Sequence, residues 1–344
     1  MKTDTLPVVA VIVATRNRAE AIEKYALASL ERSAFRDFVC VVWDASDDTA
    51  TREACESGRR PFAVCYRKAS RVGSSSQRND AVRHVLTAYP SVRVAVFIDD
   101  DCELSEDALD GVMETFRSGR VSIVNIPTKP VASPSFRAKV RKRVKRCLRM
   151  NRHGAAPFLY NYGGEDETPG GDGEWASGGG MAVDISVFRE LHIFFPEAFQ
   201  RFGGYALGED FAFSFFVFKK LHGRIVNSLR GHFLHYAAGS SRLDIKNMAA
   251  SKWYNFHLLF DAVYGDLTGL KKTVLTFAFK LFMYAAALKL LIRARSLDIR
   301  AAARGIAAAR AALRLCRRES GEYPALFDGC EKACKNSMDW ERTW

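Results

Sequence analysis

Short runs of apolar, often β-branched residues recur through the first 125 positions, and segments with helical spacing separate them. The runs cover residues 8–14, 38–43, 62–66 and 92–98, and the helical segments between them include residues 22–30 and 77–88. An apolar run without polar alternation is typical of a strand that is buried on both faces, as in a parallel sheet. Strands that alternate with helices predict βαβ units. We therefore expect an α/β fold with a mostly parallel central sheet.

The composition is that of a folded globular chain with an unusual charge. Of the 344 residues, 48% are apolar and 26% are charged, which is enough apolar content for a sizeable core. The formal net charge is +12. A basic balance favours polyanionic partners, which include nucleic acids, anionic membranes and phosphate-bearing substrates, so charge alone leaves the class of partner open.

Polar clusters follow three of the predicted strands, at the point where each strand ends. They are Thr15-Arg16-Asn17, residues 44–48, and Asp99-Asp100-Asp101. The carboxyl ends of parallel strands gather at one edge of a sheet, and ligands of α/β folds bind there. The clusters therefore predict one shared ligand site.

The Asp99-Asp100-Asp101 run predicts a metal site. Carboxylates this close repel one another and raise each other's pKa, and a divalent cation removes that cost. Carboxylate oxygens suit Mg²⁺ or Mn²⁺, which bind through one or two carboxylates plus substrate phosphates. A solvated acidic turn is the alternative, and the position directly after a buried strand makes it less favourable.

Several short motifs occur in order along the chain: residues 8–18, the turn Asp44-Ala45-Ser46-Asp47, Arg78-Asn79, residues 97–104, and Gly208-Glu209-Asp210. Taken in this order, they resemble those of the family 2 glycosyltransferases of GT-A fold. The resemblance covers residues 7–240. It implies a GT-A domain over residues 1–240, with a nucleotide-binding half (1–125) and an acceptor half (126–240). Residues 241–344 would form a helical, basic C-terminal region.

The same resemblance implies roles for individual residues. Thr15 and Arg16 would line the nucleotide pocket, and Asp44 would accept a hydrogen bond from the base. Arg78 would reach the nucleotide or its phosphates. The full set of nucleotide-binding candidates is Thr15, Arg16, Asn17, Asp44, Ser46, Arg78, Asp99 and Asp100. Asp101 would ligate a Mn²⁺ or Mg²⁺ cofactor that bridges the diphosphate, while Asp100 would contact the ribose side and Asp99 would do part of either task.

Glu209 and Asp210 are the catalytic candidates. In enzymes with this resemblance one carboxylate deprotonates the attacking hydroxyl of the acceptor, which is general-base catalysis with inversion at the anomeric carbon. We favour Asp210 as the base, with Glu209 orienting the acceptor or exchanging roles with it. The alternative is that an acidic pair at a helix start interacts with the helix dipole.

Further residues carry weaker signals. His235, in Gly231-His232-Phe233-Leu234-His235, resembles a position that completes the metal or diphosphate site, although a structural histidine is the alternative, and the signal for His232 is weaker still. Trp175 and Gly179, within a glycine run that ends at Gly180, resemble an acceptor-binding segment. Trp175 could stack on a sugar ring or belong to the core.

The C-terminal third predicts contact with a membrane surface. Residues 273–292 are nearly apolar but include Lys280 and Lys289, which favours a packed or interfacial helix over a spanning one. Residues 136–153 and 295–318 predict amphipathic basic helices, for which an anionic membrane or plain solvent could be the neighbour. The first seven residues have no secretory pattern, so we expect a cytoplasmic protein that is peripheral on the inner face of the cell membrane.

The function expected from these features is inverting transfer from a nucleotide-diphospho-sugar to a hydroxyl of a saccharide or lipid-linked acceptor. Assembly of cell-surface polysaccharide or lipopolysaccharide is the setting that the resemblance implies. A polyanion- or nucleic-acid-binding protein is one alternative, although no nucleic-acid-binding motif appears and no nucleic acid partner is expected. A sugar-phosphate nucleotidyltransferase on a similar fold and a non-catalytic binding module are the others.

Overall fold

The computed structural model describes residues 7–131, 154–155, 159, 161–162, 168–236, 244–293, 296–320 and 326–327. The predicted basic helix at 136–153 lies outside these residues.

The first half of the chain forms parallel strands with helices between them. Strands β1 (Val9–Thr15), β2 (Phe38–Asp44), β3 (Ala63–Lys68) and β4 (Val94–Asp99) are all parallel and lie in the order β4-β1-β2-β3. The connecting helices are α1 (Ala19–Ala21), a π-helical turn (Ile22–Leu27), α2 (Ala28–Arg32), α3 (Ala50–Glu56) and α4 (Ser74–Ala88), and α5 (Ala108–Arg117) follows β4. The predicted α/β fold is confirmed.

The second half extends the sheet with mixed directions. Strand β11 (Met181–Asp184) runs antiparallel to β4 and to β6 (Ile123–Asn125), and β12 (Ile225–Asn227) and β10 (Asp172–Gly173) complete an eight-stranded sheet. A smaller sheet contains β5 (Cys102–Leu104), β13 (Phe233–His235) and β7 (Thr128–Lys129), and β8 (Gly154–Ala155) pairs with β9 (Asn161–Tyr162). Because His235 pairs with Cys102 in this smaller sheet, it lies beside the acidic run.

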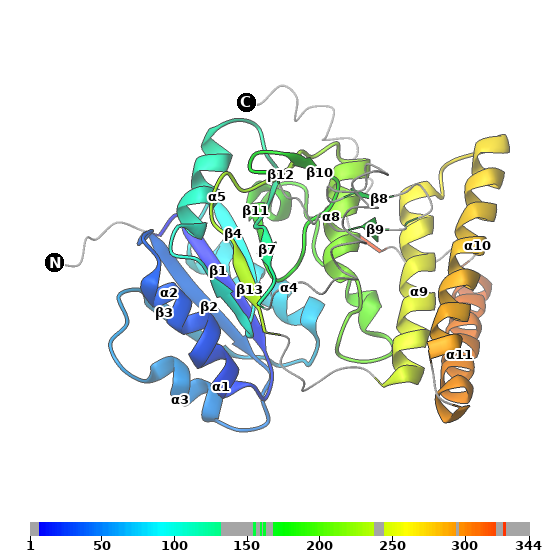
Figure 1. Cartoon of the computed structure of the whole chain (residues 1–344), viewed down its shortest axis with the longest axis horizontal. Coiled ribbons are helices and arrows are strands. Elements are labelled where there is room, and N and C mark those ends of the chain that lie inside the picture. Colours follow the sequence, from blue (N-terminus) through cyan, green and yellow to red (C-terminus); the bar gives the residue numbers. More distant parts are fainter. Residues whose placement is uncertain are drawn as a thin grey trace.

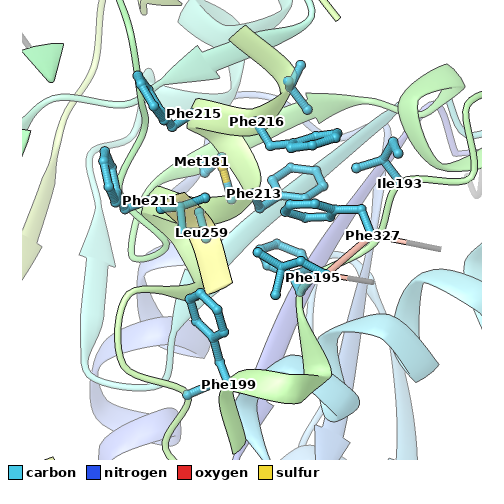
Figure 2. Packing of buried hydrophobic residues seen from close by; sticks show 14 of the residues in the cluster. Met181, Ile193, Phe195, Phe199, Phe211, Phe213, Phe215, Phe216, Leu259 and Phe327 are labelled. Carbon is cyan, nitrogen blue, oxygen red and sulfur yellow. The ribbon is translucent and has the colours of Figure 1, made fainter. Parts of the chain in front are cut away.

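An aromatic core surrounds helix α8 (Glu209–Lys220). This helix is apolar around most of its circumference, and such a helix must be buried on several sides. Phe213 stacks between Phe188 and Phe195, at ring-centroid distances of 5.5 and 4.5 Å. Figure 2 shows this cluster, with Phe216 and Phe327 packed beside it. Short helices α7 (Ser186–Arg189) and Glu197–Gln200 border the same region.

The C-terminal helices form a layer beside this core. Figure 1 shows α9 (Ile245–Tyr264), α10 (Gly269–Arg293) and α11 (Ser296–Ser320) on the side of the molecule away from β3 and α3. Buried residues of α9, including Trp253 and Leu258, belong to the same apolar cluster as those of α8. The last helices therefore pack against α8 and share its core.

Helix α11 covers the predicted amphipathic basic helix at 295–318, and of the two neighbours left open for it, a membrane or solvent, its packing agrees with solvent on the basic face. Its apolar residues Ala302, Ala309 and Leu313 are buried, because they pack against α9. The contact is close enough that a Cβ on Gly305 would lie 2.1 Å from the Lys246 carbonyl oxygen. The basic arc, with Arg304, Arg310 and Arg314, remains exposed. A helical wheel shows such an arc but does not show which neighbour covers it.

Within the described part of the chain, no helix combines the length and apolarity that crossing a bilayer requires.

Candidate active site

The site lies at the carboxyl ends of β1, β2 and β4. Thr15 pairs with Asp44 across β1 and β2, and Ala14 pairs with Asp99 across β1 and β4. The polar clusters that follow these strands therefore meet at one edge of the sheet, as the order of strands and helices predicts.

The loops after β1 and β2 are held together by hydrogen bonds. Asn17 donates from its side-chain amide to Asp47 at 2.7 Å, and the Asp47 amide donates back to Asn17 Oδ1 at 2.8 Å. The backbone N–H of Asn17 also donates to Ser46 Oγ at 2.7 Å. Asn17 has a φ of 54°, a left-handed conformation that asparagine tolerates better than most residues. Arg16 pairs with Asp47 at the exposed rim of the site.

Asp44 lies deeper than the other candidates. Its side chain is fully buried, Oδ2 accepts from the Tyr66 hydroxyl at 2.9 Å, and Oδ1 accepts from the amide and hydroxyl of Ser46. Both carboxylate oxygens thus have protein partners within the fold. Its role with the base stays a prediction.

Asp100 is held by residues of the β1 loop. Oδ2 accepts from the Thr15 hydroxyl at 2.7 Å, and Oδ1 accepts from Arg18 at 2.8 Å. Burial raises the pKa of Asp100 to about 6, against the opposing effects of the Arg18 charge and of these hydrogen bonds. Arg18 also lies 3.4 Å from Asp101, so it places a positive charge against the acidic run.

Asp99, Asp101, Cys102 and His235 form a group with potential metal-ligand atoms within 4.8 Å of one another. His235 Nε2 lies 3.1 Å from Asp101 Oδ1, and this hydrogen bond raises the pKa of His235. Carboxylate oxygens and an imidazole nitrogen suit a divalent cation such as Mn²⁺. Burial raises the pKa of the Cys102 thiol well above its usual value, which disfavours the thiolate that would bind metal. The donor set fits a divalent cation held by Asp99, Asp101 and His235.

Arg78 joins this group to the catalytic candidates. Its guanidinium donates to Asp99 Oδ1 at 2.8 Å and to Glu209 Oε1 at 2.6 Å, and the side chain is buried. Burial also raises the pKa of Glu209 to about 7; Arg78 opposes this shift and Asp210 adds to it. One guanidinium is shared among several carboxylates, so it compensates Glu209 only in part.

Asp210 is more accessible than Glu209. It is partly exposed, whereas Glu209 is buried. Oδ2 of Asp210 accepts from the Gly178 amide at 2.9 Å, and Oδ1 accepts from the Phe211 amide at 2.7 Å. The carboxylate therefore contacts the helix start, as the alternative interpretation predicts, and it also lies within the site.

The glycine run 178–180 lies close against the acidic residues of the site. A Cβ on Gly178 would lie 3.1 Å from Asp210 Cβ and 3.2 Å from Arg78 Nη2, and one on Gly179 would lie 3.4 Å from Asp99 Oδ2. A Cβ on Gly178 would therefore crowd Asp210 and Arg78, whereas one on Gly179 would only touch Asp99. Trp175 packs edge-on against Phe211 at 5.8 Å and is partly buried, so part of its surface belongs to the core.

Other predicted residues lie apart from the site or were missed. His232 lies outside the metal group, and its amide donates to Ser105. The sequence reasoning assigned no role to Arg18, Cys102 or Gln77. Gln77 donates to the carbonyls of Thr15 and Trp43 at 2.8 and 2.9 Å and so ties α4 to the ends of β1 and β2. The sequence signal that could have found Gln77 is the polar run Ser75-Ser76-Gln77-Arg78-Asn79 at a helix start. In the structure all five residues are buried.

Comparisons with known proteins agree with this architecture. Residues 10–168 match the sequence model of the family described as glycosyl transferase family 2. The S. aureus TarS 1–349 structure in complex with UDP-GlcNAc is 15% identical, with a TM-score of 0.55 over 97% of this chain and 91% of that one. The mannosyltransferase PcManGT from Pyrobaculum calidifontis, in complex with GDP-Man and Mn²⁺, is 16% identical, with a TM-score of 0.53 over 98% and 89% of the two chains. No curated protein sequence matches the chain significantly.

The fold shared with these structures is the GT-A fold, and the sequence match and the fold together define the chain as a glycosyltransferase. More particularly, the sequence match is to glycosyl transferase family 2, over residues 10–168 of the 344.

Proposed function

We propose that the protein transfers a sugar from a nucleotide-diphospho-sugar to a hydroxyl group of an acceptor, with inversion at the anomeric carbon. The observation that carries this proposal is the Arg78 bridge, which holds the Asp99 side of the site and the Glu209-Asp210 side together. The leaving diphosphate and the attacking hydroxyl must both lie next to the anomeric carbon. The arrangement would place the diphosphate on the Asp99 side and the hydroxyl on the Glu209-Asp210 side.

The donor would bind at the strand ends. Thr15, Arg16, Asn17 and Ser46 lie where a nucleoside could bind, and Asp99, Asp101 and His235 would hold a divalent cation next to its diphosphate. When bound, such a cation neutralises the charge that develops on the leaving group. The donor and metal complexes of TarS and PcManGT, which share the fold, support this proposal. Mn²⁺ or Mg²⁺ fits the donor set.

The acceptor would bind on the α8 side. Asp210 would take the proton of the acceptor hydroxyl as the hydroxyl oxygen attacks the anomeric carbon, and the bond to the diphosphate would break on the opposite face. The partial exposure of Asp210 supports its assignment as the base, and the burial of Glu209 supports a positioning role through Arg78. Trp175 and Gly179 would border the acceptor.

We further propose that residues 1–240 form the catalytic unit, divided near residue 125, and that residues 241–344 brace it. Work on a saccharide or lipid-linked acceptor for cell-surface glycan or lipopolysaccharide, at the inner face of the cell membrane, is the proposed setting. The net charge of +12 supports a peripheral position on an anionic membrane.

Donor turnover tests this proposal. Purified protein is incubated with UDP- and GDP-sugars and Mn²⁺, and release of the nucleoside diphosphate is measured with and without a sugar acceptor. We expect release with one donor class, and Asp210→Asn should lower kcat by about 10²- to 10⁴-fold with unchanged donor affinity. Asp172→Asn, at an exposed ion pair with Arg224, is the matched control and should behave as wild type. Product of retained anomeric configuration, read by NMR, would contradict the inverting mechanism.

A further inference from the structure

Helix α10 carries an apolar stripe that faces solvent. Its side chains are exposed by 55–79%, and they are Leu270, Val274, Phe277, Leu281, Tyr284 and Leu288. The spacing alternates between four and three residues, which at about 100° per residue keeps all of them within about 40° of one line along the helix. A continuous exposed apolar surface of this kind marks an interaction site.

The stripe is separate from the face that packs on the protein. On the opposite side of α10, Phe279 and Met283 are buried, and Phe279 stacks on Phe260 of α9 at 4.3 Å. The helix is thus fixed by its inner face and presents a second apolar face outward. Figure 1 shows α10 at the edge of the molecule, farther from the sheet than α9.

Exposed lysines flank the stripe. Lys271 and Lys289 lie about 100° to one side of it, and Lys280 lies about 80° to the other. The sequence from Gly269 to Arg293 contains no acidic residue. The exposed arginines of α11, including Arg304 and Arg310, add positive charge next to α10. Apolar side chains between lysines are the pattern of a helix that lies in a lipid interface, where the lysine stems extend towards the headgroups.

We propose that α10 docks on an anionic lipid bilayer, with the stripe in the boundary between headgroups and acyl chains and with the lysines on the lipid phosphates. This inference deepens the proposed membrane setting and rests on it. A second copy of the chain fits less well, because a two-fold interface would place the same lysines against one another without a compensating carboxylate on α10. An anionic surface meets both the apolar and the charged part of the helix.

Vesicle flotation tests the inference with the full chain. Wild type should float with mixed phosphatidylglycerol and phosphatidylcholine vesicles and much less with phosphatidylcholine alone. Phe277→Ser with Leu281→Ser should lower the partition coefficient by about tenfold or more. The triple change Lys271→Gln, Lys280→Gln and Lys289→Gln should lower it by about a hundredfold, since each lysine near the surface contributes about fivefold.

The matched control variants remove apolar or charged side chains at exposed positions away from α10. Val131→Ser removes an exposed apolar side chain, and Arg36→Gln with Arg59→Gln and Arg117→Gln removes an equal charge from exposed positions. Both should stay within about threefold of wild type. All variants should keep the wild-type melting temperature, because the changed residues are exposed.

Three outcomes would overturn the inference: wild type that does not float, stripe variants that float as wild type does, and a wild-type dimer in sedimentation that the stripe variant converts to monomer. Nucleotide binding, measured by calorimetry on the same samples, separates this inference from the proposed function. A stripe variant that no longer floats but still binds nucleotide would show that the stripe is needed for lipid binding and not for donor binding. Normal flotation without nucleotide binding would contradict the proposed donor site alone.

Discussion

Arg78 is the residue at which the two carboxylate groups of the site meet. Its planar guanidinium donates to Asp99 from one nitrogen and to Glu209 from another, a geometry that lysine could not reproduce. Phe195 lies under the guanidinium, with its ring centroid 5.5 Å away. A change of charge at Asp99 therefore alters how well Arg78 neutralises Glu209, and a change at Glu209 alters how well it neutralises Asp99.

The buried Glu209 predicts a pH dependence of stability. Its pKa is raised to about 7, above the ordinary value of 4.5, so the folded protein binds more protons than the unfolded chain between these two values. The free energy of unfolding should therefore fall as the pH rises through this window, by up to about 3 kcal/mol from this group. Urea denaturation at pH values from about 5 to about 8 measures this loss of stability.

Glu209→Gln supplies the comparison for this measurement. Glutamine stays neutral and nearly isosteric, so the variant should lack the part of the slope that Glu209 contributes. An identical pH slope in the two proteins would mean that Glu209 is ionised throughout the window.

At the scale of elements, the start of α4 positions the site. Gln77 fixes the ends of β1 and β2, Arg78 reaches the acidic groups, and Asn79 exchanges hydrogen bonds with the backbone of Phe195. These polar side chains are buried at consecutive positions, where each needs a partner to offset the loss of water. The helix start therefore ties the ends of β1 and β2 to the segment around Phe195.

The packing of α11 on α9 gives a prediction at the same scale. A Cβ on Gly305 would lie 2.1 Å from a backbone oxygen of α9, so Gly305→Ala should force the helices apart. We expect a loss of about 1–3 kcal/mol in the free energy of unfolding, larger than the gain of up to about 1 kcal/mol from helix propensity. Gly119→Ala is the control, because the nearest atom to its Cβ would be 3.7 Å away. Equal stability of the two variants would show that α9 and α11 are not in close contact.

For the whole molecule, the fold follows closely from local patterns. The buried strands were predictable because each is an uninterrupted apolar run, and their polar ends meet because parallel strands end at one edge. The placement of His235 depends on the pairing of β13 with β5, distant segments whose register no local pattern fixes. Arg18 was missed for a related reason, since its partners Asp100 and Asp101 belong to another loop. The burial of the α11 arc likewise depends on α9.

We propose above all that Asp99, Asp101 and His235 bind a nucleoside diphosphate through a divalent cation. The most direct measurement is a thermal-shift comparison of wild type and Asp101→Ala with UDP, GDP and dTDP, each with and without Mn²⁺. Because a ligand that binds only the folded state raises its stability, one nucleotide should raise the wild-type melting temperature when Mn²⁺ is present, and the variant should lose this shift. A shift that is equal in the variant, or equal without Mn²⁺, would contradict the claim.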